Sequence, residues 1–154
     1  MRIGLIADTH GLFRPDVAGA FKGVELIFHA GDVGSIDVLA ELDCLAPVVA
    51  VRGNVDSSEL RLPATLVREI GGVGICVTHG NEVGSPTPDR LASRYRADVI
   101  VFGHTHRPIV RRVGATLVVN PGAAGPRRFN LLPSVAVLTI ENGTAQVEIV
   151  NLLA

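Results

Sequence analysis

The sequence contains few of the residues that mark disulfide-rich, nucleic-acid-binding or membrane-spanning proteins. Only two cysteines occur among 154 residues, too few for a disulfide framework or a cysteine-rich zinc site. Cys44 and Cys76 both have apolar neighbours, and we expect both to be small core residues. Tryptophan is absent and aromatic residues make up 4% of the chain, which argues against stacking platforms for single-stranded nucleic acid.

Long apolar runs and an excess of either charge are also missing. Gly, Pro or charged residues interrupt each apolar run well before the roughly 20 residues that a membrane span needs, and the N-terminus does not resemble a signal peptide. The formal net charge is -1, so bulk electrostatic binding to nucleic acid or to a membrane surface is not expected. We therefore expect a cytoplasmic protein without a membrane partner.

Length and hydrophobic content are those of one globular domain. Hydrophobic residues make up 47% of the chain, and a domain of this length buries roughly 70% of the surface of its unfolded chain. No repeat, low-complexity segment or linker interrupts the sequence. We therefore predict a single domain over residues 1–154.

Short apolar runs alternate with helical patterns in the N-terminal half and follow one another directly in the C-terminal half. They predict strands at Arg2–Ala7, Glu25–Phe28, Pro47–Val51, Leu66–Ile70, Val73–Thr78, Asp98–Phe102, Ile109–Val113, Thr116–Val119, Ser134–Ile140 and Thr144–Val150. Helices are predicted at Pro15–Phe21, Ser35–Leu42 and Thr87–Tyr95. Gly71-Gly72 and Asn142-Gly143 each separate two strands as tight hairpin turns do. Parallel βαβ units followed by hairpins predict an α/β domain with mixed sheets.

Polar residues with metal-binding chemistry follow five of the predicted strands. They are Asp8-Thr9-His10, His29-Ala30-Gly31-Asp32, Arg52-Gly53-Asn54-Val55-Asp56, His79-Gly80 and Gly103-His104-Thr105-His106. Ligands of α/β sheets bind outside the carboxyl ends of the strands, and residues two apart in an extended segment point the same way. All five histidines of the chain lie in these segments. We therefore expect one pocket to collect them.

The combination of carboxylates, imidazoles and one amide predicts a metal centre. Asp, Asn and Gly at strand ends often only form turns, but two carboxylates and several imidazoles in one pocket would be poorly paired without a cation. The donor set suits Mn, Fe, Zn, Co or Ni and argues against a thiolate site. The candidate ligands exceed what one ion takes, so two ions about 3.5–4 Å apart are expected, a geometry used for hydrolysis at phosphorus.

The chain resembles the calcineurin-like metallophosphoesterases, and among them the small bacterial single-domain phosphodiesterases. The resemblance covers nearly the whole chain and rests on the ordered motifs Asp8-x-His10, Gly31-Asp32, Gly53-Asn54, His79-Gly80 and Gly103-His104-x-His106. It implies a four-layer α/β/β/α sandwich of two mixed sheets flanked by helices. It also implies two divalent ions, with Mn favoured and Ni, Fe, Co, Zn or Mg as alternatives. The implied ligands are Asp8, His10, Asp32 and His106 for one ion and Asp32, Asn54, His79 and His104 for the other, with Asp32 bridging.

The activity that this resemblance implies is hydrolysis of a small phosphodiester by a hydroxide that bridges the two ions. In this interpretation Asp32, Asn54 and His104 are catalytic, and Asn54 also orients a phosphoryl oxygen. Many larger members carry a His directly after the Gly-Asn pair, proposed to protonate the leaving group, whereas this chain has Val55. Without that acid, we expect substrates whose leaving group departs as a stable anion.

Residues beside the motifs are candidate substrate contacts. Arg52 could contact a phosphate oxygen, or it could form an ion pair with Asp56. Arg127 lies in a segment, Pro126-Arg127-Arg128, that resembles the family's late loop near the site, and it is the second predicted contact, with a solvated arginine as the alternative. His29 is either structural, a support for the ligands or a general acid. The connections at 56–58 and 80–87 are expected to form the rim of an open, shallow cleft.

Two other functions are compatible with the motifs. The retromer scaffold subunit shares the implied fold and serves as a non-catalytic protein-binding platform, but its branch lacks the bridging Asp and has an altered Gly-Asn pair, whereas Asp32 and Asn54 are both present here. Ions that only stabilise the fold are the other alternative, although structural zinc sites are four-coordinate and usually Cys-rich. Apolar surface on the C-terminal hairpins could also support a homodimer.

Overall fold

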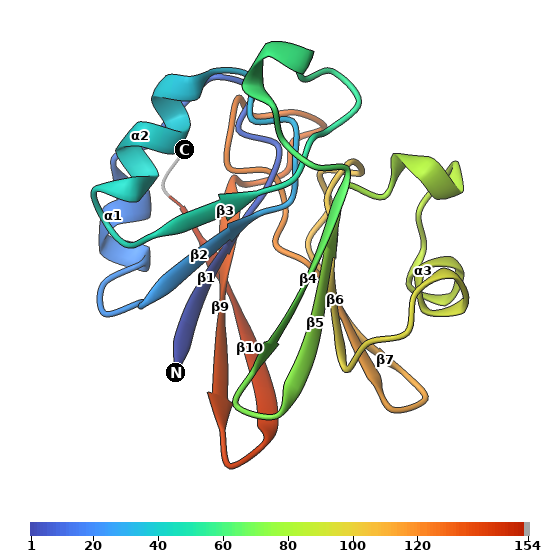
Figure 1. Ribbon diagram of the computed structural model, residues 1–154. Coiled ribbons are helices and arrows are strands. Elements are labelled where there is room, and N and C mark those ends of the chain that lie inside the picture. Colours follow the sequence, from blue (N-terminus) through green and yellow to red (C-terminus); the bar gives the residue numbers. More distant parts are fainter. Residues whose placement is uncertain (153–154) are drawn as a thin grey trace.

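Two five-stranded sheets form the centre of the computed structural model, which describes residues 1–152 (Figure 1). The first sheet has the order β10 (Thr144–Asn151), β9 (Ser134–Glu141), β1 (Arg2–Ile6), β2 (Leu26–His29) and β3 (Val48–Ala50). The second has the order β4 (Thr65–Ile70), β5 (Val73–Thr78), β6 (Val99–Val101), β8 (Thr116–Asn120) and β7 (Ile109–Val113). Each sheet contains both parallel and antiparallel pairs. The predicted mixed sheets are therefore confirmed.

Within residues 1–152, three short helices lie outside the sheets. They are α1 (Asp16–Ala20), α2 (Ile36–Asp43) and α3 (Pro88–Arg94). The Ser35 hydroxyl accepts a hydrogen bond from the N–H of Asp37 at the start of α2, and the Thr87 hydroxyl accepts one from Arg90 at the start of α3. Such caps satisfy backbone donors that the helix leaves free. Two short 3₁₀ turns, Ser58–Leu60 and Asn81–Val83, were not predicted.

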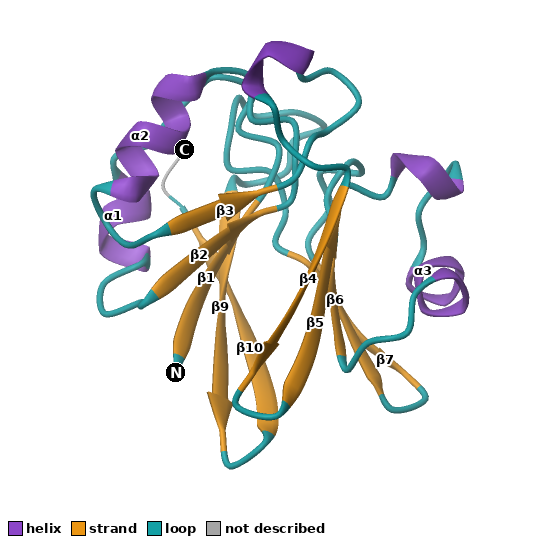
Figure 2. Ribbon diagram, in the orientation of Figure 1, coloured by secondary structure: helices purple, strands orange, loops and turns teal. Residues whose placement is uncertain are grey.

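Packing follows the alternation of side chains along each strand. Ile3 and Leu5 of β1 point between the sheets, where Ile75, Val99 and other aliphatic residues form the central core. Ile6 points the other way, into a second cluster that includes Val17 of α1 and Val38 of α2. A third cluster places Leu91 of α3 against the outer face of the second sheet. The result is the predicted four-layer α/β/β/α sandwich (Figure 2).

Parallel strands bring the functional segments to one end of the molecule. Strands β1, β2 and β3 run in parallel, as do β5, β6 and β8. The loops that follow them gather at the upper end of the two sheets in Figure 2. Gly71-Gly72 and Asn142-Gly143 join antiparallel pairs as predicted, and Gly114-Ala115 forms a third hairpin that was not predicted.

One prediction about the core is wrong. Cys76 is buried, but Cys44 is exposed at the end of α2. Its apolar neighbours Leu45 and Ala46 turn toward the core instead. Among residues 1–152, no helix is long and apolar enough to cross a membrane. The last two residues of the predicted domain, 153 and 154, lie outside the described part of the chain.

Candidate metal centre

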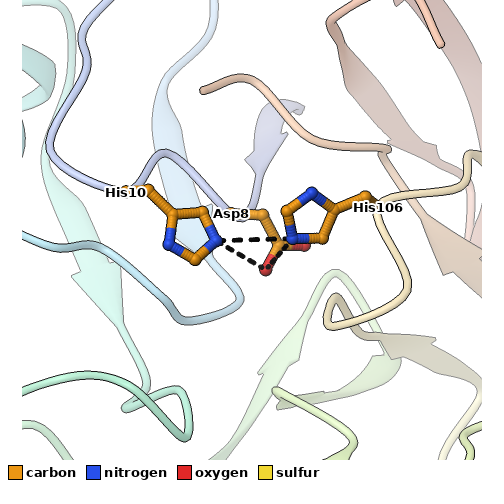
Figure 3. Close-up of side chains that lie close together, drawn as sticks. All are labelled: Asp8, His10 and His106. Carbon is orange, nitrogen blue, oxygen red and sulfur yellow. Dashed lines mark hydrogen bonds and ion pairs between the residues drawn. The ribbon is translucent and has the colours of Figure 1, made fainter. Parts of the chain in front are cut away.

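The first half of the site joins the loops after β1 and β6. Nε2 of His10 lies 3.3 Å from Nε2 of His106, and Oδ1 of Asp8 lies 4.0 Å from the former and 3.7 Å from the latter. The three side chains point toward one another (Figure 3). Their ligand atoms all lie within 4.8 Å of one another, so one ion could contact all three.

The second half joins the loops after β2, β3, β5 and β6. Nε2 of His79 lies 3.2 Å from Oδ2 of Asp32 and 3.0 Å from Oδ1 of Asn54. That amide oxygen is also 3.1 Å from Nδ1 of His104. Asp8, Asp32 and His79 form a second group whose ligand atoms lie within 4.8 Å of one another. The structure thus brings together the seven residues that the sequence motifs single out.

Asp32 lies between the two halves. Its Oδ2 is 3.7 Å from Nε2 of His10 and 3.2 Å from Nε2 of His79, while its Oδ1 accepts the N–H of Val55 at 3.1 Å. Gly53 packs so closely on this carboxylate that a Cβ at that position would overlap it. A side chain in the Gly53 position would therefore displace Asp32, which explains the glycine in the motif.

The backbone is strained at these ligands. Nine non-glycine residues of the described chain have a left-handed φ, and Asp8, His10, Asp32, His104 and His106 are five of them, with φ between 46° and 75°. Such conformations cost on the order of 1–3 kcal/mol each and persist where the surrounding structure enforces them, often at functional sites. The strain therefore aims these side chains into one pocket at the expense of local stability.

The charges of the site fit a cation. Oδ1 of the buried Asp8 carboxylate has no hydrogen-bond partner in the described structure, although it faces three imidazoles. Burial raises the pKa of Asp8 to about 7 and lowers the pKa of His106 to about 4. Burial also lowers the pKa of His10 and His104. The pocket therefore favours neutral imidazoles at His10, His104 and His106, as metal ligation requires, and a divalent ion would supply the partner that Oδ1 of Asp8 lacks.

His79 presents one fixed nitrogen to the site. Its Nδ1 lies 2.8 Å from the carbonyl oxygen of Ala30, and because a carbonyl only accepts, Nδ1 donates that hydrogen bond in the neutral ring. Nε2 then carries the lone pair and faces Asp32. Burial alone would lower the pKa of His79, but hydrogen bonding to Asp32 and the charge of Asp8 raise it. An imidazole held this way is oriented for metal ligation.

His29 is a support and not a ligand. Its ring is fully buried, Nδ1 accepts the N–H of Gly31 at 3.1 Å, and Nε2 donates to the Thr9 hydroxyl at 2.9 Å. Thr9 in turn donates to the carbonyl of Val33 at 2.9 Å. This chain of hydrogen bonds ties the loop that carries Asp8 and His10 to the loop that carries Asp32. Because both ring nitrogens are engaged inside the protein, the geometry favours a supporting role for His29 over that of a general acid.

The structure separates the alternatives for Arg52. Asp56, its predicted ion-pair partner, instead accepts hydrogen bonds from the backbone N–H groups of Val33, Gly34 and Gly53. The described residues contain no ion pair between Arg52 and Asp56. Arg52 is exposed and lines a cavity beside Asn54. The ion-pair alternative is therefore wrong, and the position of Arg52 leaves it available to an anion.

The two arginines of the late loop differ in their surroundings. Arg127 is exposed and donates to the carbonyl of Asn130, in its own loop, at 3.4 Å. The charge of Arg128 contributes to lowering the pKa values of Asp8, His10 and His106. Both residues are exposed and line a small pocket with His106, so Arg127 stays a predicted substrate contact and Arg128 joins it.

A four-layer sandwich with clustered Asp, His and Asn ligands at its strand ends defines a metal-dependent phosphoesterase. The family model described as "Calcineurin-like phosphoesterase superfamily domain" matches residues 1–143, and the chain belongs to this family. A probable metallophosphoesterase of Methanothermobacter thermautotrophicus is 38% identical, over 98% of this chain and 92% of that protein. A phosphodiesterase of Methanocaldococcus jannaschii is 30% identical, over 79% of this chain and 83% of that protein. The resemblance stated from the motifs is confirmed.

Solved structures support the same fold. Wild-type Vps29 of Entamoeba histolytica complexed with zinc aligns with a TM-score of 0.80 and 26% identity, over 98% of this chain and 99% of that chain. An archaeal phosphodiesterase aligns with a TM-score of 0.77 and 25% identity, over 97% of this chain and 100% of that chain. The fold is thus shared by a protein whose structure holds a metal ion and by one described as an enzyme.

Proposed function

We propose that this protein is a phosphodiesterase that uses two divalent metal ions. One ion would be held by Asp8, His10, Asp32 and His106, and the other by Asp32, Asn54, His79 and His104. The observation that carries the proposal is the position of Asp32 Oδ2, within 3.7 Å of His10 Nε2 and 3.2 Å of His79 Nε2. When bound, such ions lower the pKa of water to about 7 and offset the negative charge that develops on phosphoryl oxygens.

The residues of the chain position the substrate around that centre. Asn54 directs its amide oxygen at the imidazoles of His79 and His104, which leaves its N–H₂ group free to donate to a phosphoryl oxygen. His104 is half-buried at the mouth of the site, and its lowered pKa keeps it neutral near pH 7. Arg128 adds positive charge on the side of Asp8. These groups together favour a phosphate ester that enters between Asn54 and Arg128.

The residue after Asn54 limits the substrates. Val55 has 60% of its surface exposed and no ionisable group, so it supplies no proton to a departing alcohol. The leaving group must then depart as a stable anion, which favours diesters of acidic alcohols.

The proposal also covers the metal, the partner and the location. Mn²⁺ is the ion we propose to test first, the proposed partner is a small phosphodiester, and the proposed location is the cytoplasm. The two free cysteines suit a reducing compartment. The homodimer stays a prediction.

A non-catalytic protein-binding scaffold is the second candidate. The observation in its favour is the similarity to Vps29 at a TM-score of 0.80. Asp32 and Asn54 favour the enzyme, because a binding platform needs neither a bridging carboxylate nor an amide beside it.

Metal stoichiometry tests the two-ion arrangement. Chelator-treated protein should bind two Mn²⁺ ions per chain in isothermal titration calorimetry, and Asp32→Ala should bind fewer and more weakly because it removes the ligand shared by both halves. Arg111→Ala, an exposed residue of β7, is the matched control and should retain both ions. One ion per chain in the wild type, or an unchanged titration of Asp32→Ala, would contradict the proposal.

A further inference from the structure

A cavity of about 600 Å³ opens beside the metal centre. Asn54 belongs to both, so a group bound at the metal centre borders directly on the cavity. Three segments line it: the connection between β3 and β4, the turn after β5 and the end of α3. The residues that decide its chemistry are Arg52, Asn54, Asp56, Glu82, Arg94 and Tyr95. The volume lies in the range of small-molecule sites, about 300–1,000 Å³.

The two acids of the cavity wall are engaged by the protein itself. Asp56 accepts three backbone N–H groups, at 2.9 Å, 2.9 Å and 3.2 Å. Glu82 accepts the hydroxyls of Thr78 and Tyr95, each at 2.5 Å, and the N–H of Gly80 at 3.1 Å. Burial alone would raise the pKa of Glu82, but these hydrogen bonds lower it below its ordinary value. Both carboxylates are therefore anchors of the surrounding loops and offer little to a ligand.

The two arginines of the wall are in the opposite situation. Within residues 1–152, the guanidinium of Arg52 makes no hydrogen bond or ion pair. That of Arg94 lies 5.2 Å from the centre of the Tyr95 ring and has no acidic partner in the same range. A guanidinium carries five N–H donors. The charge left unpaired in the cavity wall is therefore positive, and the two guanidinium groups supply hydrogen-bond donors to it.

We propose that this cavity holds one alcohol arm of the phosphodiester substrate and that this arm carries a second phosphate group. The inference rests on the proposed phosphodiesterase function. A phosphate offers only acceptor oxygens at neutral pH and matches the planar fork of an arginine. Tyr95 adds an apolar ring surface beside the two arginines. An arm of about the size of a phosphorylated nucleoside or sugar fits the volume.

Two chromogenic esters that differ in one phosphate test the proposal. The p-nitrophenyl ester of thymidine 5′-phosphate has an uncharged 3′ hydroxyl. The second compound carries the same p-nitrophenyl ester on its 5′-phosphate and a free phosphate group at the 3′ position. For the Mn²⁺-loaded enzyme, kcat/KM should be about tenfold or more higher for the second ester, as expected for charge-assisted hydrogen bonds. The ratio should fall toward one in Arg52→Met and in Arg94→Met. Arg111→Met, on β7, is the matched control and should keep the wild-type ratio.

Calorimetry supplies a readout that does not depend on turnover. The Mn²⁺-loaded protein should bind thymidine 3′,5′-bisphosphate about tenfold or more tightly than thymidine 5′-phosphate, and each arginine variant should lose that difference. Fructose 1,6-bisphosphate has two phosphates and no base. If this sugar binds as tightly as the thymidine compound, the second phosphate alone is recognised. If it binds more weakly, the thymine base also contributes to binding.

Failure of the inference is separable from failure of the proposed function. Turnover of bis(p-nitrophenyl) phosphate with equal kcat/KM for the two thymidine esters would overturn the phosphate-binding cavity and leave the phosphodiesterase intact. A wild-type preference that survives in both arginine variants would also overturn it. Absence of all turnover would contradict the proposed function. The calorimetric comparison would still decide whether the cavity binds a second phosphate group.

Discussion

Oδ2 of Asp32 lies 3.2 Å from Nε2 of His79. Hydrogen bonding across this contact lowers the pKa of Asp32 against the opposing effect of burial, and it raises the pKa of His79. Without metal, a proton on Nε2 of His79 therefore pairs the imidazolium with the Asp32 carboxylate. An ion bound between them must displace that proton, so metal binding should release protons. In the metal-free protein, this contact supplies the positive charge that a metal ion would otherwise bring to Asp32.

Metal should stabilise the fold. Oδ1 of Asp8 is buried without a partner, and an ion at this position removes that penalty. At a free Mn²⁺ concentration about 100 times its Kd, the stabilisation should be about 2.7 kcal/mol, a rise in Tm of roughly 5–10 °C for a domain of this size. Differential scanning fluorimetry measures it. Asp8→Asn should lose the rise while remaining folded, and an equal rise in that variant would contradict the role of Asp8.

Gly53→Ala should disturb the site through Asp32. The new methyl group would overlap the Asp32 carboxylate, so we expect about 1–3 kcal/mol of destabilisation and a drop in metal-dependent turnover. Gly19→Ala is the matched control, because a Cβ at Gly19 in α1 meets nothing within 4 Å, and it should stabilise the helix by roughly 0.5–1 kcal/mol. Urea unfolding and Mn²⁺ titration check both variants. Wild-type Mn²⁺ affinity in Gly53→Ala would show that Asp32 tolerates displacement.

His29 should make the protein acid-sensitive. Burial lowers the pKa of His29 from 6.5 to about 3, so between these values the unfolded chain binds a proton that the folded chain excludes. Stability from this group is complete above pH 6.5 and decreases on acidification by about 1.4 kcal/mol per pH unit.

His29→Asn removes this titration and keeps an acceptor for the Gly31 N–H. The metal-free variant should be less stable at pH 7, and its free energy of unfolding should fall less steeply between pH 6.5 and pH 4. His106 also titrates in this range with a pKa of about 4, so the difference between the two slopes is the quantity to compare. Equal slopes in urea unfolding would show that His29 does not carry the effect.

Leaving-group acidity should control turnover. Because Val55 supplies no proton, rates for p-nitrophenyl, p-chlorophenyl and phenyl esters of thymidine 5′-phosphate should fall steeply as the phenol becomes less acidic. Val55→His places an imidazole at an exposed position and should flatten this dependence, since general acids contribute roughly 10²–10⁴-fold. Stopped assays at saturating Mn²⁺ measure the series. A wild-type rate that does not depend on the acidity of the phenol would contradict the claim that no residue protonates the leaving group.

The strand pattern and the ligand motifs were readable from the sequence for physical reasons. Strands such as Val73–Thr78 are rich in β-branched residues, which indicates a strand, and the glycines that precede them in a turn indicate where the strand begins. Within each sheet the motif residues follow strands that run in parallel, so they lie at one edge of that sheet, and the face-to-face packing of the two sheets brings the two sets together. Asp32 and Asn54 could therefore be placed in one site before the structure was known.

Other features depend on contacts that no local pattern carries. Cys44 has the same apolar neighbours as a core residue, but its place at the end of α2 exposes it. The hydrogen bond of Arg127 within its own loop, and the effect of the Arg128 charge on Asp8, depend on how one loop crosses the site. Arg94 and Tyr95 lie about 40 residues from Asn54 in the sequence, and only the packing of α3 on the outer face of the second sheet brings them to the same cavity.

Hydrolysis of bis(p-nitrophenyl) phosphate by chelator-stripped protein, with and without added Mn²⁺ and beside Asp32→Ala, tests the central claim most directly. The account predicts turnover that requires the metal and is lost by at least about 100-fold in the variant, a loss of roughly 2.7 kcal/mol in transition-state stabilisation. Absence of turnover with Mn²⁺, Ni²⁺, Co²⁺, Zn²⁺ and Mg²⁺ alike, in a protein that still binds metal, would contradict it and favour the protein-binding scaffold.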